Sequence, residues 1–456
     1  MEGERAPTPS AEASAAAGGP SAPAPVVRSV APPGPPRASR VPALRHRNFR
    51  LFLGGMLVSF VGTWMQTIGQ AWLVLILTRD PFVLGLVTAA QGLPIVVLGL
   101  FGGVIADRAP KRAVILVCQS TMLALAAVLA GLCLTGVIEV WHVILLAFAL
   151  GAVNAIDLPA RQAFVVEMVR PTDTASAVGL HSSAYSGARL VGPAVAGLVI
   201  AAATSWLGDG VRASGVAFAA NAVSYLFVLV AVAAIREDEL FLSVRPAVPR
   251  GLRTAFRQIA DGLAYLRGAR PVLATLVVPG LIATIAVNFG VLVPVLAVEE
   301  FGMDSSGLGL LLAAAGVGGL LSALRIGVGG RAGPRVLIGG ALVLGVAEVA
   351  TGLVGVPLAS AVALFLAGAG AVAMRTAANT NIQLATPQHL RGRVMSVFSI
   401  VFEGSSPMGG LLAGALAASL GVRLAFVITG VGAVLVAVLG ASAVARIGRP
   451  ADATDR

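Results

Sequence analysis

The sequence predicts an all-α membrane protein of twelve transmembrane helices arranged as two pseudo-symmetric six-helix bundles. Of its 456 residues, 57% are hydrophobic and only 12% are charged, which leaves too little polar surface for a soluble domain of this size. Twelve apolar stretches are long enough to cross a bilayer core of about 30 Å, which takes about 20 helical residues. A polar interval at 236–270 separates the first six stretches from the last six.

The expected spans are joined by short connections, so consecutive helices must run antiparallel. They cover residues 50–78, 82–106, 112–136, 141–165, 175–204, 213–235, 271–298, 306–329, 334–355, 357–384, 392–419 and 422–446. Residues 1–45 are mostly Ala, Pro, Ser and Gly, a composition that cannot offset the entropy of ordering, so we expect a disordered tail there. This division leaves bundles at 46–235 and 271–446, the linker at 236–270 and a short tail at 447–456.

Basic residues indicate how the helices are oriented. The chain carries 31 arginines and one lysine, and its net charge is +11. With the N-terminus in the cytoplasm, 27 of these 32 residues fall in cytoplasmic tails, loops and helix ends, whereas Arg79, Arg212 and Arg423 lie on the other side. Because cytoplasmic loops concentrate Lys and Arg, we expect a multi-pass protein of the inner membrane with both termini cytoplasmic.

The linker contains a stretch with helical periodicity, GLRTAFRQIADGLAYLR. Its apolar residues recur at helical spacing and are Leu252, Phe256, Ile259, Leu263 and Leu266. With arginines on the remaining positions, this pattern predicts an amphipathic helix on the anionic inner leaflet. A solvated linker helix is the alternative.

An internal duplication relates the two halves. The segment EMVRPTDTASAVGLHSSAYSGARLVGP aligns with QLATPQHLRGRVMSVFSIVFEGSSPMGG, so that Pro171 matches Pro387 across 216 residues. Two repeated halves related by an axis along the membrane normal are typical of transporters that hold their substrate between the halves.

The loop between the second and third expected spans carries a charged motif, GGVIADRAPKR. It resembles the loop signature of the major facilitator superfamily, G-x-x-x-D-R-x-x-R/K-R/K, at Gly103, Asp107, Arg108, Lys111 and Arg112. In that pattern the glycine permits close helix approach, the aspartate can lie near a helix N-terminus across the half–half interface, and the cations anchor the loop inside. The equivalent loop of the second half has no aspartate, so this latch would be one-sided.

Three further segments resemble the enterobactin-exporter branch of that superfamily: DLPARQAFVVEMV, ARLVGPAVAG and LRGRVMSVFS. The resemblance implies export of siderophores or drugs, with the proton gradient as driving force and no cofactor. GPAVAG is also similar to a shortened antiporter motif, in which Gly192, Pro193 and Gly197 would make a kinked, closely packed helix. Ordinary helix packing is the alternative.

Five ionisable residues lie within the expected spans away from their ends, and Arg161, closer to the end of its span, is a sixth candidate for coupling or gating. The six are Asp157, Arg161, Arg189, Glu348, Arg375 and Glu403. A charge at the membrane centre costs at least about 2.5–3.5 kcal/mol unless it is paired or hydrated, so we expect these side chains to face the bundle interior.

Opposite charges at equivalent positions of the repeat suggest a cytoplasmic gate. Our hypothesis is that Asp157 pairs with Arg375, and Arg189 with Glu403, when that side is closed. Static pairs that stabilise one packing are the alternative. Proton coupling needs an acid that alternates between desolvated and hydrated states, and Glu403 and Asp157 are the best candidates, followed by Glu348.

Polar residues on the expected spans suggest a substrate cavity, because amides in hydrocarbon need partners. The candidates are Trp64, Gln66, Gln70, Gln91, Asn154, Asn288, Asn379 and Asn381, with His181 and Tyr185 deeper in the packing. For any one of them, hydrogen bonding between helices is the alternative role. Amides, an indole and aliphatic residues together are suited to a small amphipathic or aromatic ligand.

The sequence therefore predicts a secondary active transporter, and a proton-coupled exporter of drugs or siderophores working by alternating access is the first hypothesis. An uptake permease and a non-transporting membrane sensor or scaffold are the alternatives. We find no Walker loop, HExxH or nucleophile elbow, which argues against an enzyme. The two cysteines and four histidines form no metal-binding pattern, and arginines that follow topology argue against nucleic-acid binding. We expect a monomer in the bilayer.

Overall fold

The computed structural model describes residues 42–241, 252–329 and 332–445. Residues 1–41 and 447–456 of the predicted tails lie outside these ranges. Pro42–Arg45 forms a 3-10 turn, η1, with Ala43 fully buried, so the ordered chain begins before the predicted tail boundary.

Among the described residues, twelve helical segments are long and apolar enough to cross a membrane, as predicted. The first six are α1 (Arg47–Thr78), α2 (Pro81–Arg108), α3 (Lys111–Thr135), α4 (Val140–Glu167), α5 (Thr174–Leu207) and α6 (Gly210–Ala233). The other six are α8 (Arg270–Ala286) continued by α9 (Phe289–Val295) and η4 (Leu296–Glu300), then α10 (Ser305–Gly329), α11 (Pro334–Leu353), α12 (Pro357–Ala385), α13 (Arg391–Leu420) and α14 (Val422–Ala445).

Local chemistry explains why several of these helices begin where they do. Asp80 caps α2 by accepting a hydrogen bond from the Phe82 N–H, and Asp209 caps α6 in the same way through Val211. Four helices (α2, α8, α11 and α12) carry proline in their first turn, where the missing N–H would have had no helical partner.

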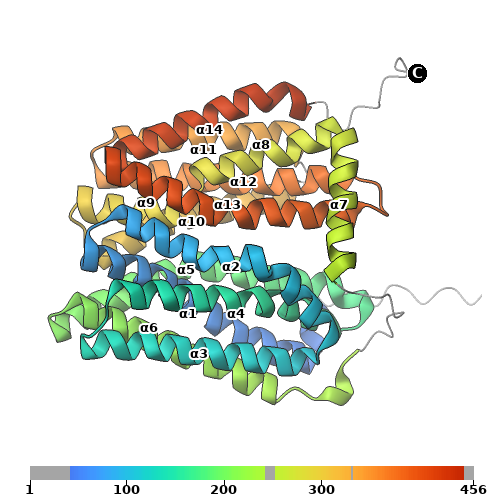
Figure 1. Ribbon diagram of the computed structural model, residues 1–456, viewed down its shortest axis with the longest axis horizontal. Helices are drawn as coiled ribbons and strands as arrows, with labels where there is room; N and C mark the ends of the chain where they lie inside the picture. The colour runs from blue at the N-terminus through green and yellow to red at the C-terminus, as the bar shows by residue number, and fades with distance from the viewer. Residues whose placement is uncertain (1–41, 242–251, 330–331, 446–456) are drawn as a thin grey trace, which may run out of the picture. The chain divides into compact units, whose positions relative to one another are not determined.

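The two groups of six helices repeat the same packing. In the first group α2 packs on α4, α3 on α6, and α1 on α5 and α6. In the second group the equivalent pairs are α10 with α12, α11 with α14, and α8 with α13 and α14. Figure 1 shows α1–α6 on one side and α8–α14 on the other. We call these groups the N-half and the C-half.

Glycines at equivalent positions of the repeat bring helix backbones together. A Cβ on Gly102 of α2 would clash with the carbonyl oxygen of Ala155 on α4. Gly318 of α10, 216 residues later, meets the Phe365 carbonyl of α12 in the same way. The duplication therefore preserves a close helix crossing in each half.

The seventh span is interrupted at Val287 and Asn288, between α8 and α9. The Asn288 amide donates to the carbonyl oxygens of Thr284 and Ile285 at 2.9 and 3.0 Å, and so satisfies backbone groups that the break leaves open. Pro294 follows within α9, and a π-helical turn, η4, completes the span. Such broken spans line binding regions in many transporters.

The halves contact each other closely near one end of the helices. We call the end where α1 begins and α14 ends the terminal end, and the opposite one the far end. Near the far end, Gly85 of α2 meets the backbone of Gly410 on α13, and Gly197 of α5 meets Ser305 on α10. Nearer the terminal end, a Cβ on Gly404 of α13 would meet only the Val96 methyl groups of α2 within 4.0 Å, so the packing is looser at this point than at Gly85.

The predicted linker helix is present as α7 (Leu252–Gly268), which runs across the ends of the other helices in Figure 1. It is anchored on α13 by an Asp261–Arg393 ion pair at 3.0 Å and by Leu266, which is buried in the core of the C-half. Phe256 and Leu263 of its apolar set remain exposed, whereas the side chain of Leu252 lies outside the described part.

Candidate functional site

Aromatic side chains and arginines meet between α1 and α5. The Arg189 guanidinium of α5 lies over the Trp64 ring of α1, 5.2 Å from its centroid. Tyr185 of α5 packs beside Trp64 at 5.9 Å and against Phe60 at 5.2 Å. The Phe60 ring also carries the Arg161 guanidinium of α4, at 5.5 Å. Trp64 thus contacts a charged group, as expected of a binding residue.

The C-half contributes a second arginine and a carboxylate. Arg375 of α12 and Glu403 of α13 lie 3.6 Å apart, and both side chains are more than half exposed, at 53% and 55%. Arg375 also lies over the Phe402 ring at 5.6 Å. Arg189 interacts electrostatically with Arg375 and Glu403 across the two halves. We call Trp64, Tyr185, Arg189, Arg375 and Glu403 the central cluster.

The predicted gate pairs, which we expect when the cytoplasmic side is closed, are not formed in this structure. Asp157 pairs instead with Arg161, one turn further along α4, at 2.5 Å, and both carboxylate oxygens accept from the Gln119 amide of α3 at 3.1 and 3.2 Å. Arg375 pairs with Glu403, which belongs to its own half. Residues at equivalent positions of a repeat meet only close to the symmetry axis, and these side chains find nearer partners.

Glu348 lies apart from the central cluster. It is fully buried on α11, where one carboxyl oxygen lies 2.9 Å from the Thr429 hydroxyl of α14. Its other carboxyl oxygen has no partner among the described residues. Glu348 therefore links two helices of the C-half and does not reach the space between the halves.

Most of the predicted cavity amides serve packing instead. Gln66 is buried and accepts a hydrogen bond from Asn221 of α6 at 2.6 Å, so it faces the interior of the N-half. Asn154 donates to Leu150 of its own helix, Asn288 satisfies the break in the seventh span, and Asn379 accepts from Gln383. Gln66 and Asn288 are therefore buried and hydrogen-bonded within their own halves, and their assignment to a cavity stays a prediction.

The remaining predicted cavity residues have no contact with the central cluster that the structure records. Gln70 is buried, and Gln91 is half-buried where its backbone meets Gly151 of α4. Asn381 is buried, and its amide nitrogen has no partner among the described residues.

The charged loop motif joins helices of the N-half. Lys111 forms a 2.8 Å ion pair with Glu167 at the end of α4. Arg112 donates to the carbonyl oxygens of Val232 and Ala233 at 3.1 and 2.8 Å, which caps the last turn of α6. The cations therefore anchor the loop, as the motif predicts.

The motif's other residues differ in how they are placed. A Cβ on Gly103 would meet nothing within 4 Å, so the prediction that Gly103 permits a close helix approach is wrong. Gly102, the preceding residue of α2, faces α4 and makes the close approach instead. Arg108 is exposed, and the side chain of Asp107 lies outside the described part of the chain.

The GPAVAG segment of α5 packs closely on both halves. Gly192 lies against Trp64 of α1, whereas the Gly197 carbonyl accepts a 3.2 Å hydrogen bond from the Ser305 hydroxyl of α10. Gly309 of α10 meets the Pro193 carbonyl. This segment thus forms part of the contact between the halves, just beyond Arg189.

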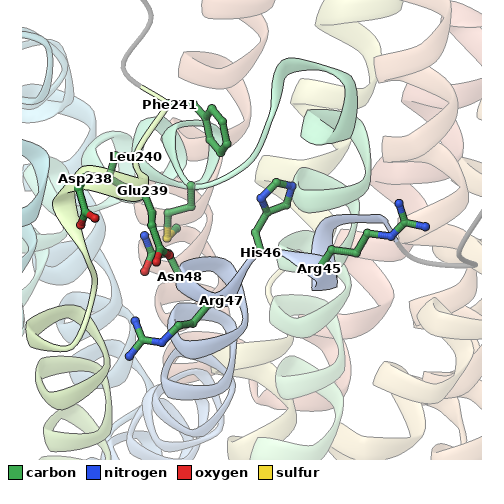
Figure 2. Close-up of a pocket in the computed structure, with 9 residues that line it drawn as sticks. Arg45, His46, Arg47, Asn48, Asp238, Glu239, Leu240 and Phe241 are labelled. Atoms are coloured by element: carbon green, nitrogen blue, oxygen red, sulfur yellow. The ribbon is translucent and has the colours of Figure 1, made fainter.

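A pocket of about 390 Å³ opens at the terminal end, where the start of α1 meets the chain that follows α6 (Figure 2). Asn48 and the backbone of Arg236 exchange two hydrogen bonds there, and His46 lies 2.9 Å from Asp173. Leu240 and Phe241 complete its lining. The hydrogen bonds of Asn48 join the start of α1 to the chain after α6, so this region braces the N-half at this end.

Sequence reasoning missed three residues of this site. Gln119 supports Asp157, Glu167 holds Lys111, and Phe402 lies under Arg375. A lone amide in the otherwise apolar α3 was the one available signal for Gln119. Phe402 carries no signal, because aromatic residues in a membrane helix more often face lipid or a neighbouring helix.

Twelve spans in two repeated bundles, with charged and aromatic groups between them, define a membrane transporter of the major facilitator class. The sequence matches the transmembrane secretion effector family over residues 38–454, and the chain belongs to this family of transporters, which are not enzymes.

Relatives of known sequence and structure share this architecture. The chain is 24% identical to the staphyloferrin A transporter of Staphylococcus aureus over 85% of this chain and 94% of that protein. It is 27% identical to the multidrug efflux pump Tap of Mycolicibacterium fortuitum, over 82% and 90%. Its fold matches a bacterial homologue of the human lysosomal transporter Spinster, in an inward-facing and occupied conformation, with a TM-score of 0.68 at 14% identity over 88% and 96%.

Proposed function

We propose that this protein exports small amphipathic molecules, such as drugs or siderophores, by alternating access driven by the proton gradient. The observation that carries the proposal is the central cluster, in which charged and aromatic side chains of both halves lie halfway along the helices within electrostatic range of one another. A static scaffold would have no reason to maintain accessible charges there, because each is costly at this depth. The names of the relatives point to export.

The conformation supports loading from the cytoplasm. The halves are in backbone contact near the far end and pack less tightly around Gly404, towards the terminal end. The distribution of arginine and lysine assigns the terminal end to the cytoplasm under the positive-inside rule. The looser packing then lies on the cytoplasmic side of the closest contact, as in the state in which an exporter takes up its substrate.

Asp157 and Glu403 are the two carboxyls that could carry the coupling proton. Glu403 is accessible and lies beside two arginines. Asp157 is fully enclosed, and its ionised form depends on Arg161 and Gln119. A proton on Asp157 would remove the charge that holds Arg161 and would weaken the hydrogen bonds from Gln119, which link α3 to α4.

Everted membrane vesicles test the proposed function. Energised everted vesicles should accumulate a fluorescent amphipathic probe above the level of vesicles without the protein, and a protonophore should abolish that accumulation. Gradient-driven release of the probe would indicate an uptake permease instead. No difference from protein-free vesicles would indicate a scaffold or sensor.

Two variants test the coupling residue in the same vesicles. Asp157→Asn should abolish accumulation but retain probe exchange across the membrane without a gradient. Glu348→Gln is the matched control, because Glu348 is equally buried but lies between α11 and α14, and it should keep gradient-driven accumulation. Normal coupling in Asp157→Asn would exclude Asp157 as the proton carrier.

A further inference from the structure

The charges of the central cluster do not balance. Arg375 pairs with Glu403 at 3.6 Å, and Arg189 lies within electrostatic range of both. Within the described part of the chain, no carboxylate forms an ion pair with Arg189, whose recorded contact is the face of the Trp64 ring. The nearby Arg161 is neutralised by Asp157. One positive charge thus remains uncompensated in the middle of a membrane protein, where an unpaired charge is costly.

The N–H donors of an arginine side chain lie in the plane of its guanidinium group, so an arginine over an aromatic ring can still donate to a ligand beside that ring. The guanidinium has five N–H donors whose spacing matches the two oxygens of a carboxylate. The Arg189 guanidinium lies over the Trp64 ring, and Tyr185 adds an exposed aromatic ring with a hydroxyl group. Phe402 supports Arg375 in the same manner from the other half. The cluster therefore offers two oriented donor groups with apolar surface beside each.

From this arrangement we infer that the substrate is an organic anion, a carboxylate attached to an apolar or aromatic body. Its carboxylate binds Arg189, and the apolar body lies against Trp64 and Tyr185. Arg375 joins the anion when it turns away from Glu403, so Glu403 acts as the resident counter-ion that the substrate replaces. This inference rests on the proposed transport function and adds the substrate class to it.

The same geometry argues that Glu403 does not carry the coupling proton of an exporter. A proton on Glu403 would release Arg375 to the anion, so protonation and anion binding would strengthen each other. A proton and an anion that strengthen each other's binding are carried across the membrane together, as in a symporter. An exporter driven by proton entry instead needs the binding of the proton and the binding of the substrate to exclude each other. Asp157 then remains as the coupling carboxyl of the two.

Binding of three matched probes to the purified full-length protein tests the substrate class by calorimetry. Naphthaleneacetate, naphthaleneacetamide and naphthylethylammonium share one ring system and differ in charge. We expect the acetate to bind about tenfold more tightly than the amide, the factor that one charge-assisted hydrogen-bonded contact provides, and the cation to bind most weakly. Equal binding of the three probes, or no binding of the acetate, would overturn the inference.

Substitutions in the cluster locate the anion. Arg189→Gln should abolish the preference for the acetate, and Arg189→Lys should retain part of it because the charge remains. Glu403→Gln should strengthen acetate binding several-fold, since the competing carboxylate is lost. Arg212→Gln, which removes an exposed arginine beside Asp209 at the far end, is the control and should change nothing. An unchanged acetate preference in both Arg189 variants would place the anion elsewhere.

The vesicle assay separates this inference from the proposed function. If the gradient drives accumulation of the amide or the cation but never of the acetate, the export function stands and the substrate class is wrong. If the acetate binds through Arg189 but no probe responds to the gradient, the site stands and the proposed function is wrong.

Discussion

Lys111, the first residue of α3, forms a 2.8 Å ion pair with Glu167, the last residue of α4, and both side chains are largely enclosed. The pair fastens the charged loop to its own half. Together with Arg112, which caps α6, it ties three helices of the N-half together at the terminal end. The loop motif thus helps the N-half to move as one body.

We expect Lys111→Met and Glu167→Gln each to destabilise the protein by about 1–3 kcal/mol, because each leaves a partly enclosed charge without its partner. Thermal unfolding of the purified protein, followed by tryptophan fluorescence, measures the loss. The reversed pair Lys111→Glu with Glu167→Lys should recover at least half of it. A reversed pair no more stable than the single variants would show that the two charges act independently.

Adjacent glycines in the loop motif should respond differently to alanine. Gly102→Ala places a methyl group against the Ala155 carbonyl and should cost about 1–3 kcal/mol through overpacking. Gly103→Ala meets open space in a helix and should be neutral or stabilising by up to about 1 kcal/mol. Unfolding midpoints of the two variants provide the comparison. Equal losses of stability in the two variants would contradict the orientation of α2, in which Gly102 and not Gly103 faces α4.

Gln66 should prove to be a packing residue. Gln66→Leu leaves the buried Asn221 amide without its acceptor and should cost about 1–3 kcal/mol of stability. The relative transport of different probes should be unchanged, because Gln66 faces α6. Trp64→Leu is the informative comparison, since it removes the ring beneath Arg189 and should change probe preference. A changed preference among the probes in Gln66→Leu would indicate that Gln66 lines the substrate cavity.

A bulky residue in the contact between α5 and α10 should hold the far end apart. Gly197→Leu would clash with the Ser305 backbone and so destabilise the conformation in which α5 and α10 are in contact. We expect transport to fall by at least about tenfold, which corresponds to a destabilisation of that conformation by about 1.4 kcal/mol or more. Ser306→Cys supplies a labelling site at this contact. Its thiol should react faster with an impermeant maleimide in the Gly197→Leu variant than in the protein that keeps Gly197.

The control for this variant lies on the same helix. Gly179→Leu fills open space on α5 and should leave both transport and labelling unchanged. The native Cys118 and Cys133 are buried and should contribute little background to the labelling. If Gly197→Leu transports normally, the α5–α10 contact does not need to re-form during transport.

Hydropathy and the 216-residue repeat were sufficient to predict the twelve spans and their division into two bundles, because both depend on properties summed over many residues. The facing direction of single polar residues was not predictable. In α1, apolar residues occur all round the helix, so no periodicity shows that Gln66 faces α6 while Trp64 faces α5.

Ion-pair partners were predicted less well than the positions of the charges. Hydropathy placed Asp157, Arg189, Arg375 and Glu403 within the spans, whereas the repeat suggests pairs for a closed cytoplasmic side and gives no distances. Asp157 had a partner one turn away in Arg161, and a local pair needs less ordering of the chain than a pair across two halves. Sequence spacing alone could have suggested that pair.

The contact between the halves near the far end combines glycine against backbone, at Gly85, Gly410 and Gly197, with a cluster of buried apolar residues from both halves that includes Leu84 and Leu308. Opening this end separates those apolar side chains, and the loss of their contacts costs free energy. One proton moving through a membrane potential of about 100 mV releases about 2.3 kcal/mol, which can offset part of that cost. The far end can therefore open only when the transport cycle supplies free energy to it.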